Sequence, residues 1–419
     1  MSKDKGFVDR FLGVAVKVQN NLYLKAISDG FAALMPLIMV GAIFAVIDSM
    51  GIPAYQDFLV NVGIKDFLKF PNMVTNGLLS IYVAFSIAYN LAKNYKLDEF
   101  MSGFVSVMAF MLLQPFTAAA DGSYQIGMNL LGAEGIFTAI IAAIVVVECT
   151  RFLISHNIYV KMPKEVPEMV ERSFKALTTV VLVMTVILAV KIAFAATSLG
   201  TLSNLIAIVI QAPLKSLGSS WISFAIILTI VNLLWFFGIH GHLVALSVML
   251  PVYLQMDIEN LAAYQAGTAL PNILSNSFIY VYGAGACVLA GFVYCLWRAK
   301  TKRFNTIAKL AFVPMLFGIG EPLAFGVPFV FNFTLFIPAV FSGTINVILA
   351  YFATVVGLLP RLNGVSINGL PVVVSGFLTG GFRVALFQVA LCILNIVVWS
   401  VFVKKMDQIE FEKEQLQAE

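Results

Sequence analysis

The sequence predicts an all-α polytopic membrane protein with about ten transmembrane helices, two re-entrant hairpins and cytoplasmic N- and C-termini. Three observations support this prediction. Charged residues make up only 11% of the 419 residues, against roughly 25% in soluble domains. The mean hydropathy is +0.93, and apolar runs of about 20 residues, long enough to cross a bilayer, recur along the chain. Two apolar segments are broken by Gly and Pro, as in the re-entrant segments of transporters.

The apolar runs divide the chain into predicted elements. Regular runs, predicted to cross the membrane, are residues 27–48, 73–91, 100–120, 135–150, 177–197, 221–237, 279–297 and 381–403. Less regular apolar stretches are residues 201–213, 241–256, 309–330 and 332–359. Apolar residues from Phe7 to Leu22 recur at helical spacing with basic residues elsewhere, which predicts an amphipathic helix on the cytoplasmic membrane surface.

We therefore predict four regions. Residues 1–26 form the cytoplasmic amphipathic helix, and 27–200 form the N-terminal membrane helices. Residues 201–403 form a second membrane region that contains both hairpins, and 404–419 form a cytoplasmic tail. The orientation follows from basic clusters, which mark cytoplasmic segments. These clusters lie near the N-terminus, at 151–175, at 298–309 and at Lys404–Lys405.

Several chemistries lack a sequence signature. No GxxxxGK[ST] loop, GxGxxG turn or HExxH motif occurs, and these are the patterns of ATP, dinucleotide and zinc sites. The four cysteines lie in or beside apolar segments without metal-ligand spacing. We expect no metal, no cofactor and no nucleic-acid partner. The energy for any transport must come from an ion gradient, a partner protein or the substrate gradient.

Glu321 is the only charged residue between Leu310 and Pro360. An ionisable side chain at membrane depth costs a few kcal/mol even on the gentlest scale, so such residues usually face a cavity or a partner. Glycines and prolines interrupt the surrounding run: Pro314, Gly318, Gly320, Pro322, Gly326 and Pro328. We therefore expect Glu321 at the tip of a re-entrant hairpin that faces a polar cavity.

A second broken segment, WFFGIHGH, spans Trp235 to His242 and lacks acidic, lysine and arginine residues. His240 lies between two glycines, and imidazole can donate and accept hydrogen bonds near neutral pH. Trp235 has two readings: an indole that stacks on a sugar ring, or a packing residue. His242 and His156 are weaker candidates, and His156 is expected to be a solvated surface residue.

Five separated stretches resemble the IIC membrane component of the bacterial sugar phosphotransferase system, in its lactose, cellobiose and diacetylchitobiose branch. They occur in the family's order over nearly the whole chain: LYLKAISDGFAALMPLIMVGA (22–42), GAEGIFTAII, KMPKEVPEMVERSFKAL (161–177), WFFGIHG (235–241) and GEPLAFGVPFVFN (320–332). Such a resemblance implies a multi-pass homodimer in the bacterial cytoplasmic membrane, in which residues 27–200 are the dimer scaffold.

The resemblance also implies a function. A disaccharide would be bound, translocated by an elevator-like movement, and phosphorylated on its 6-hydroxyl by a separate IIB protein that carries phosphocysteine. Glu321 and His240 match the residues expected at that hydroxyl, so both are predicted catalytic and substrate-binding residues. Trp235 and Asn332, in the same two motifs, are predicted substrate contacts. The basic segments at 161–175 and 298–309 are candidate docking sites for IIB, although the positive-inside bias alone also accounts for them.

The chain departs from the family pattern at four places. Gly320 replaces the usual Asn before Glu-Pro, and Phe333 replaces the Pro that usually follows Asn332. Ser28 stands where Arg is usual, and Phe382 where a Trp is usual. These departures leave the identity of the sugar open, and they also leave open whether phosphotransfer is altered.

The residues alone allow three functions. The first is the phosphotransferase-system permease, an enzyme only together with IIB. The second is a proton-coupled sugar transporter of the same fold, in which Glu321 carries the proton. The third is a membrane sugar receptor that binds without transport. The permease predicts phosphorylated sugar inside the cell, the proton-coupled transporter predicts free sugar inside the cell, and the receptor predicts binding without accumulation.

Overall fold

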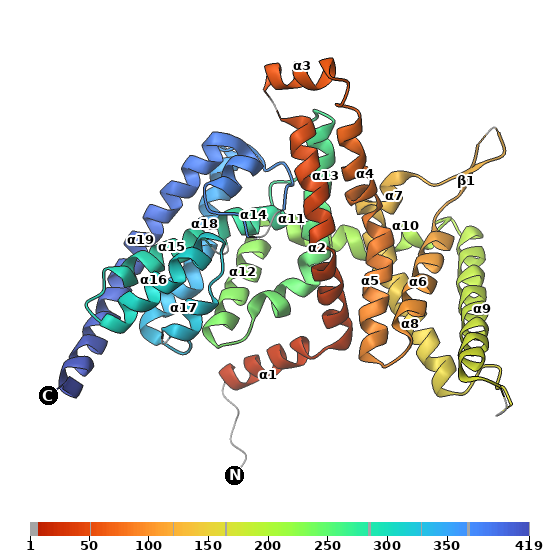
Figure 1. Cartoon of the computed structure of the whole chain (residues 1–419), viewed down its shortest axis with the longest axis horizontal. Helices are drawn as coiled ribbons and strands as arrows, with labels where there is room; N and C mark the ends of the chain where they lie inside the picture. The colour runs from red at the N-terminus through yellow and green to blue at the C-terminus, as the bar shows by residue number, and fades with distance from the viewer. Residues whose placement is uncertain are drawn as a thin grey trace, which may run out of the picture. The chain divides into compact units, whose positions relative to one another are not determined.

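The computed structural model describes residues 7–50, 52–119, 121–163, 166–283, 286–327, 329–366 and 369–418, which are mostly helical (Figure 1). The chain forms two compact units. The first comprises residues 1–15, 45–56 and 216–419, and the second comprises residues 16–44 and 57–215. Helices α1 (Phe7–Gln19), α2 (Leu22–Ser49) and α3 (Pro53–Asn61) contribute residues to both units.

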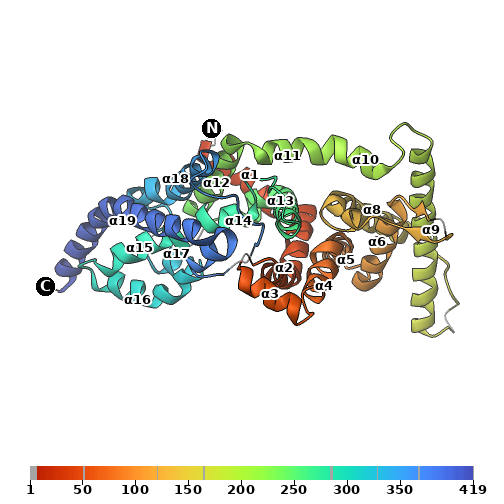
Figure 2. The same cartoon turned by 90° about the horizontal axis from the view of Figure 1, so that it is seen from above.

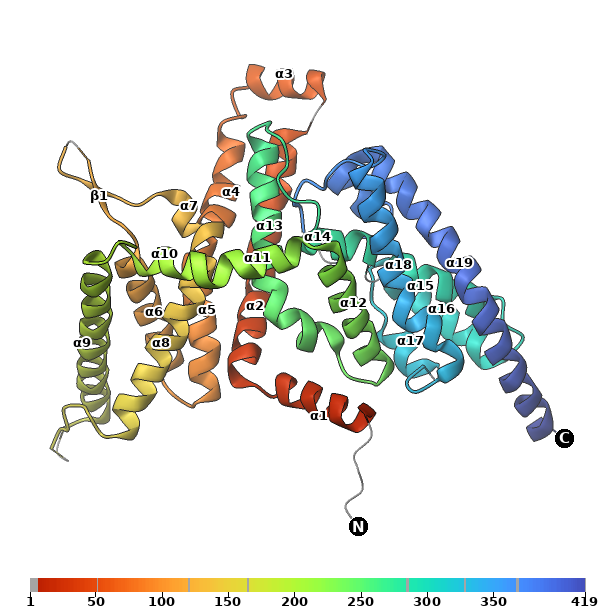
Figure 3. The ribbon, with the colours of Figure 1, turned by 180° about the vertical axis from the view of Figure 1, so that it is seen from behind.

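The second unit is built around the buried helices α5 and α8. Its elements after α3 are η1 (Phe67–Lys69), α4 (Phe70–Val74), η2 (Asn76–Leu78), α5 (Leu79–Asn94), α6 (Glu99–Leu113), β1 (Thr117–Ala118), β2 (Tyr124–Gln125), α7 (Met128–Leu131), η3 (Ala133–Gly135), α8 (Ile136–Ser155), α9 (Glu168–Ala195), α10 (Leu202–Ile206), η4 (Ala207–Gln211) and α11 (Ala212–Ser219), whose residues from Ser216 onward belong to the first unit. Helix α5 packs against both α6 and α8, and α9 lies beside α6 (Figure 3). The strands form one antiparallel hairpin that pairs Thr117 with Gln125.

Helix α6 ends at Leu113, before residue 120, the predicted end of this membrane span, and Lys191 caps the end of the helix. Its Nζ donates to the backbone carbonyls of Leu112 (2.7 Å) and Gln114 (3.0 Å). A cation at a helix C-terminus satisfies carbonyls that lack intrahelical donors and is favoured by the helix dipole. The prediction of a continuous span over 100–120 is therefore wrong, because the chain leaves the helix there and enters the β1–β2 hairpin.

The first unit contains the two broken segments that the sequence singled out. Its elements from residue 221 are α12 (Trp221–Phe236), η5 (His242–Leu246), α13 (Ser247–Gln265), α14 (Asn276–Phe278), η6 (Ile279–Gly283), α15 (Ala286–Trp297), α16 (Lys302–Leu316), α17 (Glu321–Gly326), η7 (Phe333–Leu335), α18 (Phe336–Val355) and α19 (Val374–Ala418). Helices α15, α16 and α19 lie side by side (Figure 2). Stacked Phe292 and Trp399, with ring centroids 4.3 Å apart, lie at the centre of their core.

Apolar length supports most of the predicted membrane crossings. In the described part of the chain, seven helices are long and apolar enough to cross a membrane, or eight if the pair Leu202–Ser219 and Trp221–Phe236, bent by 84°, is one broken span. The seven include the predicted runs 27–48, 73–91, 135–150, 177–197, 279–297 and 381–403, and they add the less regular stretch 332–359. The all-α polytopic fold is confirmed; the number of about ten crossings stays a prediction.

Two predicted boundaries fall inside helices. Helix α2 begins at Leu22, so the end of the predicted 1–26 helix belongs to the first long apolar helix. Helix α19 continues past residue 404 to Ala418. Asp407 is buried, and its carboxylate accepts hydrogen bonds from the backbone N–H groups of Lys300 (2.7 Å) and Thr301 (2.9 Å). The first residues of the predicted tail thus belong to the packed core.

Helix α19 is broken at Gly381 (φ 77°, ψ −166°), and buried Gln388, which follows this break, fixes the start of α19. Its Oε1 accepts from the N–H groups of Val373 (2.9 Å) and Gly376 (3.0 Å), and its Nε2 donates to the carbonyl of Val281 (2.8 Å). Val373 has a φ of 75°, a strained value for a β-branched residue. One amide side chain therefore supports both the helix start and a strained backbone position.

We expect Gln388→Leu to lower the free energy of unfolding by about 2–4 kcal/mol, because it leaves the buried N–H of Gly376 and the buried carbonyl of Val281 unpaired. Thermal unfolding in detergent would measure the change. Leu386→Ala is the matched control, since Leu386 is exposed on the same helix and should change stability by less than about 0.5 kcal/mol. Equal melting temperatures for Gln388→Leu and the control would contradict the assignment.

Candidate functional site

The His240 segment begins where α12 ends in a glycine-dependent cap. Gly238 has a φ of +78°, which favours glycine because it has no Cβ. The N–H of Gly238 donates to the carbonyl of Trp235, and the N–H of Ile239 donates to the carbonyl of Leu234. This pair of bonds is a Schellman motif. Gly241 then passes so close to the backbone of Val231 that a Cβ would collide with its carbonyl.

The Glu321 segment begins with the same cap. Gly318 has a φ of +77°. Its N–H donates to the carbonyl of Met315, and the N–H of Ile319 donates to the carbonyl of Pro314. Phe-Gly-Ile occupies corresponding positions at both helix ends, at 237–239 and 317–319. The two helices thus end in the same capping motif, which His240 follows directly and Glu321 follows after Gly320.

Backbone and aromatic contacts join the two segments. The N–H of Phe331 donates to the carbonyl of Phe236 (3.0 Å), although Phe331 has a φ of +56°. The rings of Phe331 and Phe237 lie 5.3 Å apart, and those of Phe236 and Phe336 lie 5.1 Å apart. The residues that follow α17 therefore pack directly on the end of α12. Two segments 80 residues apart in sequence form one local structure.

Trp235, His240 and His242 form a cluster at this junction. The indole and the His240 ring have centroids 4.5 Å apart, and the two imidazoles lie 6.0 Å apart. The indole Nε1–H donates to Nδ1 of His242 (3.2 Å). Because an indole N–H can only donate, His242 Nδ1 must be unprotonated, and neutral His242 carries its proton on Nε2. That buried Nε2 has no hydrogen-bond partner among the described residues.

Glu321 is the first residue of α17, with Gly320 as its N-cap and Pro322 in the first turn. Proline is favoured at this position because its missing N–H would lack a partner anyway. The other end of α17 is held by Arg303, whose Nη2 donates to the carbonyl of Gly326 (3.0 Å). The backbone position of Glu321 is thus fixed, while its side chain lies outside the described residues, as does Pro328.

Asn332 has a structural contact that the sequence did not predict. Its Oδ1 accepts from the N–H of Thr334 (3.1 Å) and caps η7. Its Nδ2 lies 3.4 Å from the sulfur of Met406 in α19. A role for Asn332 in substrate binding stays a prediction. Among the described residues, no three His, Cys, Asp or Glu side chains gather as metal ligands would.

The structure adds His242 to the candidate site, although the sequence made His242 a weaker candidate than His240. Its hydrogen bond to Trp235 spans seven residues across a helix end, so no helical periodicity predicts it. The repeated Phe-Gly-Ile was a signal available in the sequence. His156, by contrast, is exposed at the end of α8, and its Nδ1 lies 2.9 Å from the carbonyl oxygen of Phe152.

Gly320 stands where the family usually has Asn, and the effect of this difference can be tested directly. Gly320 has a φ of −98°, and an added Cβ would make only an ordinary 3.4 Å contact with Leu289. Asparagine is also a preferred N-cap residue. We expect Gly320→Asn to fold with unchanged or slightly higher stability, by at most about 1 kcal/mol. A lowered melting temperature would contradict this. The sugar affinity of the same variant, compared with that of the unaltered chain, would show whether Asn at this position contributes to binding.

Comparison with known proteins identifies the family. Residues 28–343 match the family described as "Phosphotransferase system, EIIC". The oligo-beta-mannoside-specific EIIC component of Bacillus subtilis (strain 168) is 30% identical, over 97% of this chain and 94% of that protein. The lactose-specific EIICB component of Staphylococcus aureus (strain COL) is 30% identical, over 95% of this chain and 71% of that protein.

A solved structure agrees over the whole fold. The transporter ChbC, the IIC component from the N,N'-diacetylchitobiose-specific phosphotransferase system, superposes with a TM-score of 0.92. It is 30% identical, and the match covers 98% of this chain and 99% of that one. With a matching family over most of its length and a matching fold throughout, this chain belongs to the EIIC family of phosphotransferase-system sugar permeases, multi-pass proteins of the cytoplasmic membrane.

Proposed function

We propose that this chain binds a disaccharide, carries it across the membrane and presents its 6-hydroxyl to the phosphocysteine of a cytoplasmic IIB protein. The main support is the junction at which the capped ends of α12 and α16 are followed by His240 and Glu321, with Phe331 bonded to Phe236. A site built from two rigid, capped helix ends keeps its groups in place, as catalysis by positioning requires.

Each residue has a proposed part. Trp235 stacks on one face of a sugar ring, and its N–H is already satisfied by His242, so the indole face can bind apolar sugar surface. Neutral His240 orients the 6-hydroxyl by a hydrogen bond. Glu321 accepts the proton of that hydroxyl as the oxygen attacks phosphorus and the cysteine sulfur leaves. Asn332 contributes a further polar contact to the sugar.

Phosphorylation makes the uptake irreversible. The phosphoryl group adds a charge of about −1.5 to −2. Once Glu321 has released the proton that it accepted, its carboxylate repels the charged product, which is also too polar to recross the bilayer. The chain itself supplies positioning and proton transfer, because phosphoryl transfer needs little covalent help from the protein. The proposed donor is a IIB protein, and the EIICB name of the lactose-specific relative fits such a partnership.

We further propose that residues 27–200 form the scaffold of a homodimer and that 201–403 form the moving transport region. The division of the structure into two compact units near residue 215 is consistent with separate movement. The basic segment 298–309 is the proposed IIB docking surface. Its Arg303 is exposed and connects that segment to α17 through the carbonyl of Gly326.

A sugar analogue tests the role of the 6-hydroxyl. The test uses proteoliposomes that contain this chain and enclose phosphorylated IIB. Disaccharides such as diacetylchitobiose, cellobiose and lactose are compared with their 6-deoxy forms. Each deoxy form lacks the 6-hydroxyl on the ring that accepts the phosphoryl group. We expect the deoxy form of the preferred sugar to compete for binding but to leave IIB phosphorylated. If the deoxy sugar consumes phosphorylated IIB, the proposal is contradicted, because the phosphoryl group would then be transferred to a position other than the 6-hydroxyl.

A further inference from the structure

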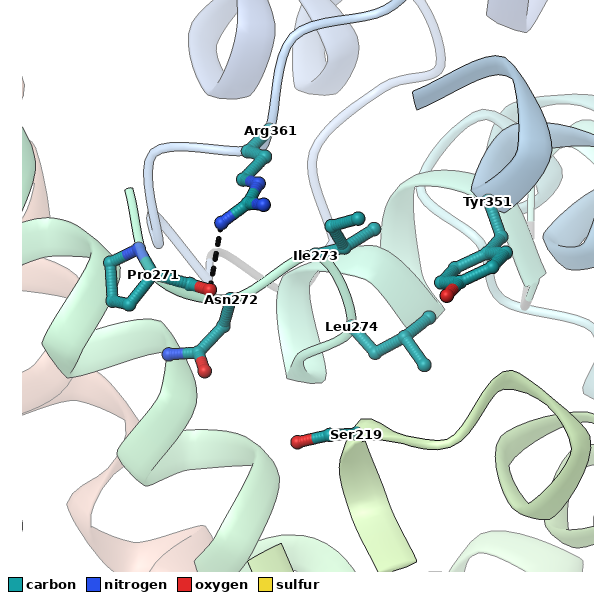
Figure 4. A pocket seen from close by; sticks show the side chains of 7 residues that line it. All are labelled: Ser219, Pro271, Asn272, Ile273, Leu274, Tyr351 and Arg361. Atoms are coloured by element: carbon teal, nitrogen blue, oxygen red, sulfur yellow. Dashed lines mark hydrogen bonds between the residues drawn. The ribbon is translucent and has the colours of Figure 1, made fainter. Parts of the chain in front are cut away.

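A cavity lies at the other end of the helices that carry the His240 site. It has a volume of about 190 Å³ and is lined by residues that include Ser219, Asn272, Leu274, Tyr351 and Arg361 (Figure 4). All of them belong to the first compact unit. The volume is below the roughly 300–1,000 Å³ of pockets that enclose a drug-sized ligand, so the cavity suits a single ring.

Arg361 is held in place and retains donors for a ligand. Its Nη1 donates to the carbonyls of Leu270 (2.5 Å) and Pro271 (2.8 Å). A guanidinium has five N–H donors, and those on Nη2 and Nε have no hydrogen-bond partner among the described residues. Because two bonds already fix the planar group, it loses little further freedom on binding.

The rest of the lining adds an acceptor, a hydroxyl and an aromatic surface. Both amide hydrogens of Asn272 are used, by the carbonyl of Met256 and by Glu259, which leaves its Oδ1 as an acceptor. Tyr351 has no hydrogen-bond partner for its hydroxyl among the described residues. Its ring stacks with Trp221 at 6.4 Å, and its hydroxyl points toward the cavity (Figure 4).

The cavity and the His240 site mark opposite ends of α12 and α18. Helix α12 begins at Trp221, beside Tyr351, and ends just before His240. At 1.5 Å per residue, its 16 residues separate the ends by about 24 Å. Lys404 and Lys405 place the end of α19 in the cytoplasm in the predicted orientation. The N–H of Asn363 donates to the carbonyl of Thr379 (2.9 Å), beside the break in α19 at Gly381. Arg361 therefore lies near the other end of the helical segment that follows Gly381, on the opposite side.

We propose that this cavity is an entry subsite that binds one pyranose ring of the incoming sugar on the non-cytoplasmic side. Sugar hydroxyls donate and accept, which matches the Arg361 donors, the Asn272 acceptor and the Tyr351 hydroxyl. A phosphate or lipid headgroup fits less well, because Arg361 is the one cation among the described residues that line the cavity. The subsite rests on the proposed transport of sugar but not on the role of Glu321.

Tyr351→Phe tests the subsite without disturbing the Arg361 bonds or the ring stacking. Losing one hydrogen bond to the sugar should raise the KM of initial sugar uptake about five- to tenfold at an unchanged maximal rate. Tyr294→Phe is the matched control, since Tyr294 is an exposed tyrosine away from the cavity, and its KM should stay within twofold. A wild-type KM for Tyr351→Phe, with phosphosugar still formed, would overturn the subsite and leave the proposed function intact.

A second measurement does not depend on phosphorylation. Ser219→Cys, in a chain whose four native cysteines are replaced by alanine, is exposed to a membrane-impermeant thiol reagent from outside, with no IIB present. The preferred disaccharide should slow the labelling at least fivefold, and a sugar that is not transported should not. Equal labelling rates with and without the disaccharide would overturn the proposal even if uptake itself failed.

Discussion

Glu321→Gln is expected to bind sugar and fold normally while phosphosugar formation falls about 10²–10⁴-fold, the usual contribution of a general base. Glutamine keeps the size and hydrogen-bonding capacity of the side chain but cannot take the hydroxyl proton. The start of α17 should persist, because Gly320, Pro322 and the bond from Arg303 to Gly326 fix the backbone there. The measurement is transfer of labelled phosphate from IIB to the disaccharide, with sugar binding measured separately.

The control for this variant is Glu134→Gln. Glu134 is exposed in the second unit and accepts a hydrogen bond from Asn129, which glutamine can also do. Its transfer rate should equal that of the unaltered chain. If Glu321→Gln phosphorylates sugar at that same rate, Glu321 is not the base, and the proposed mechanism fails.

His240→Ala should weaken disaccharide binding about 5- to 150-fold, which corresponds to the roughly 1–3 kcal/mol of a lost buried hydrogen bond. The effect should be on affinity rather than on melting temperature, because the adjoining cap is formed by Gly238 and Ile239. Isothermal calorimetry on the purified protein gives the dissociation constant directly.

His156→Ala is the matched control, because His156 is an exposed histidine at the end of α8. Its affinity for the sugar should be unchanged. If His240→Ala also leaves the affinity unchanged, His240 is only a packing partner of Trp235, whose ring centroid lies 4.5 Å from that of His240.

Composition and apolar length were enough to predict the all-α membrane fold, since few soluble chains could remain folded with so little charge. The sequence also located both broken segments, because glycine and proline act locally on the backbone. Gly238 and Gly318 do have the positive φ values that such breaks need. The end of α6 could not be predicted in the same way, since it depends on Lys191, 77 residues from Gln114.

The candidate site could be proposed from the sequence as a set of residues, but its arrangement could not be predicted. His240 and Glu321 were evident as polar residues in apolar runs. The bond between Phe331 and Phe236, which joins their segments, is a backbone contact that side-chain patterns do not encode. Nor does any local pattern show that the Trp235 indole is already bonded to His242, or that Asn332 caps η7.

The most direct test of group translocation follows the chemical form of the sugar inside the cell. Cells that express this chain with or without a cognate IIB take up radiolabelled diacetylchitobiose or cellobiose, and free and phosphorylated sugars are then separated. We expect phosphosugar only when IIB is present, with uptake that a protonophore does not abolish. Free sugar that accumulates without IIB and is lost with a protonophore would contradict group translocation and make Glu321 a proton carrier.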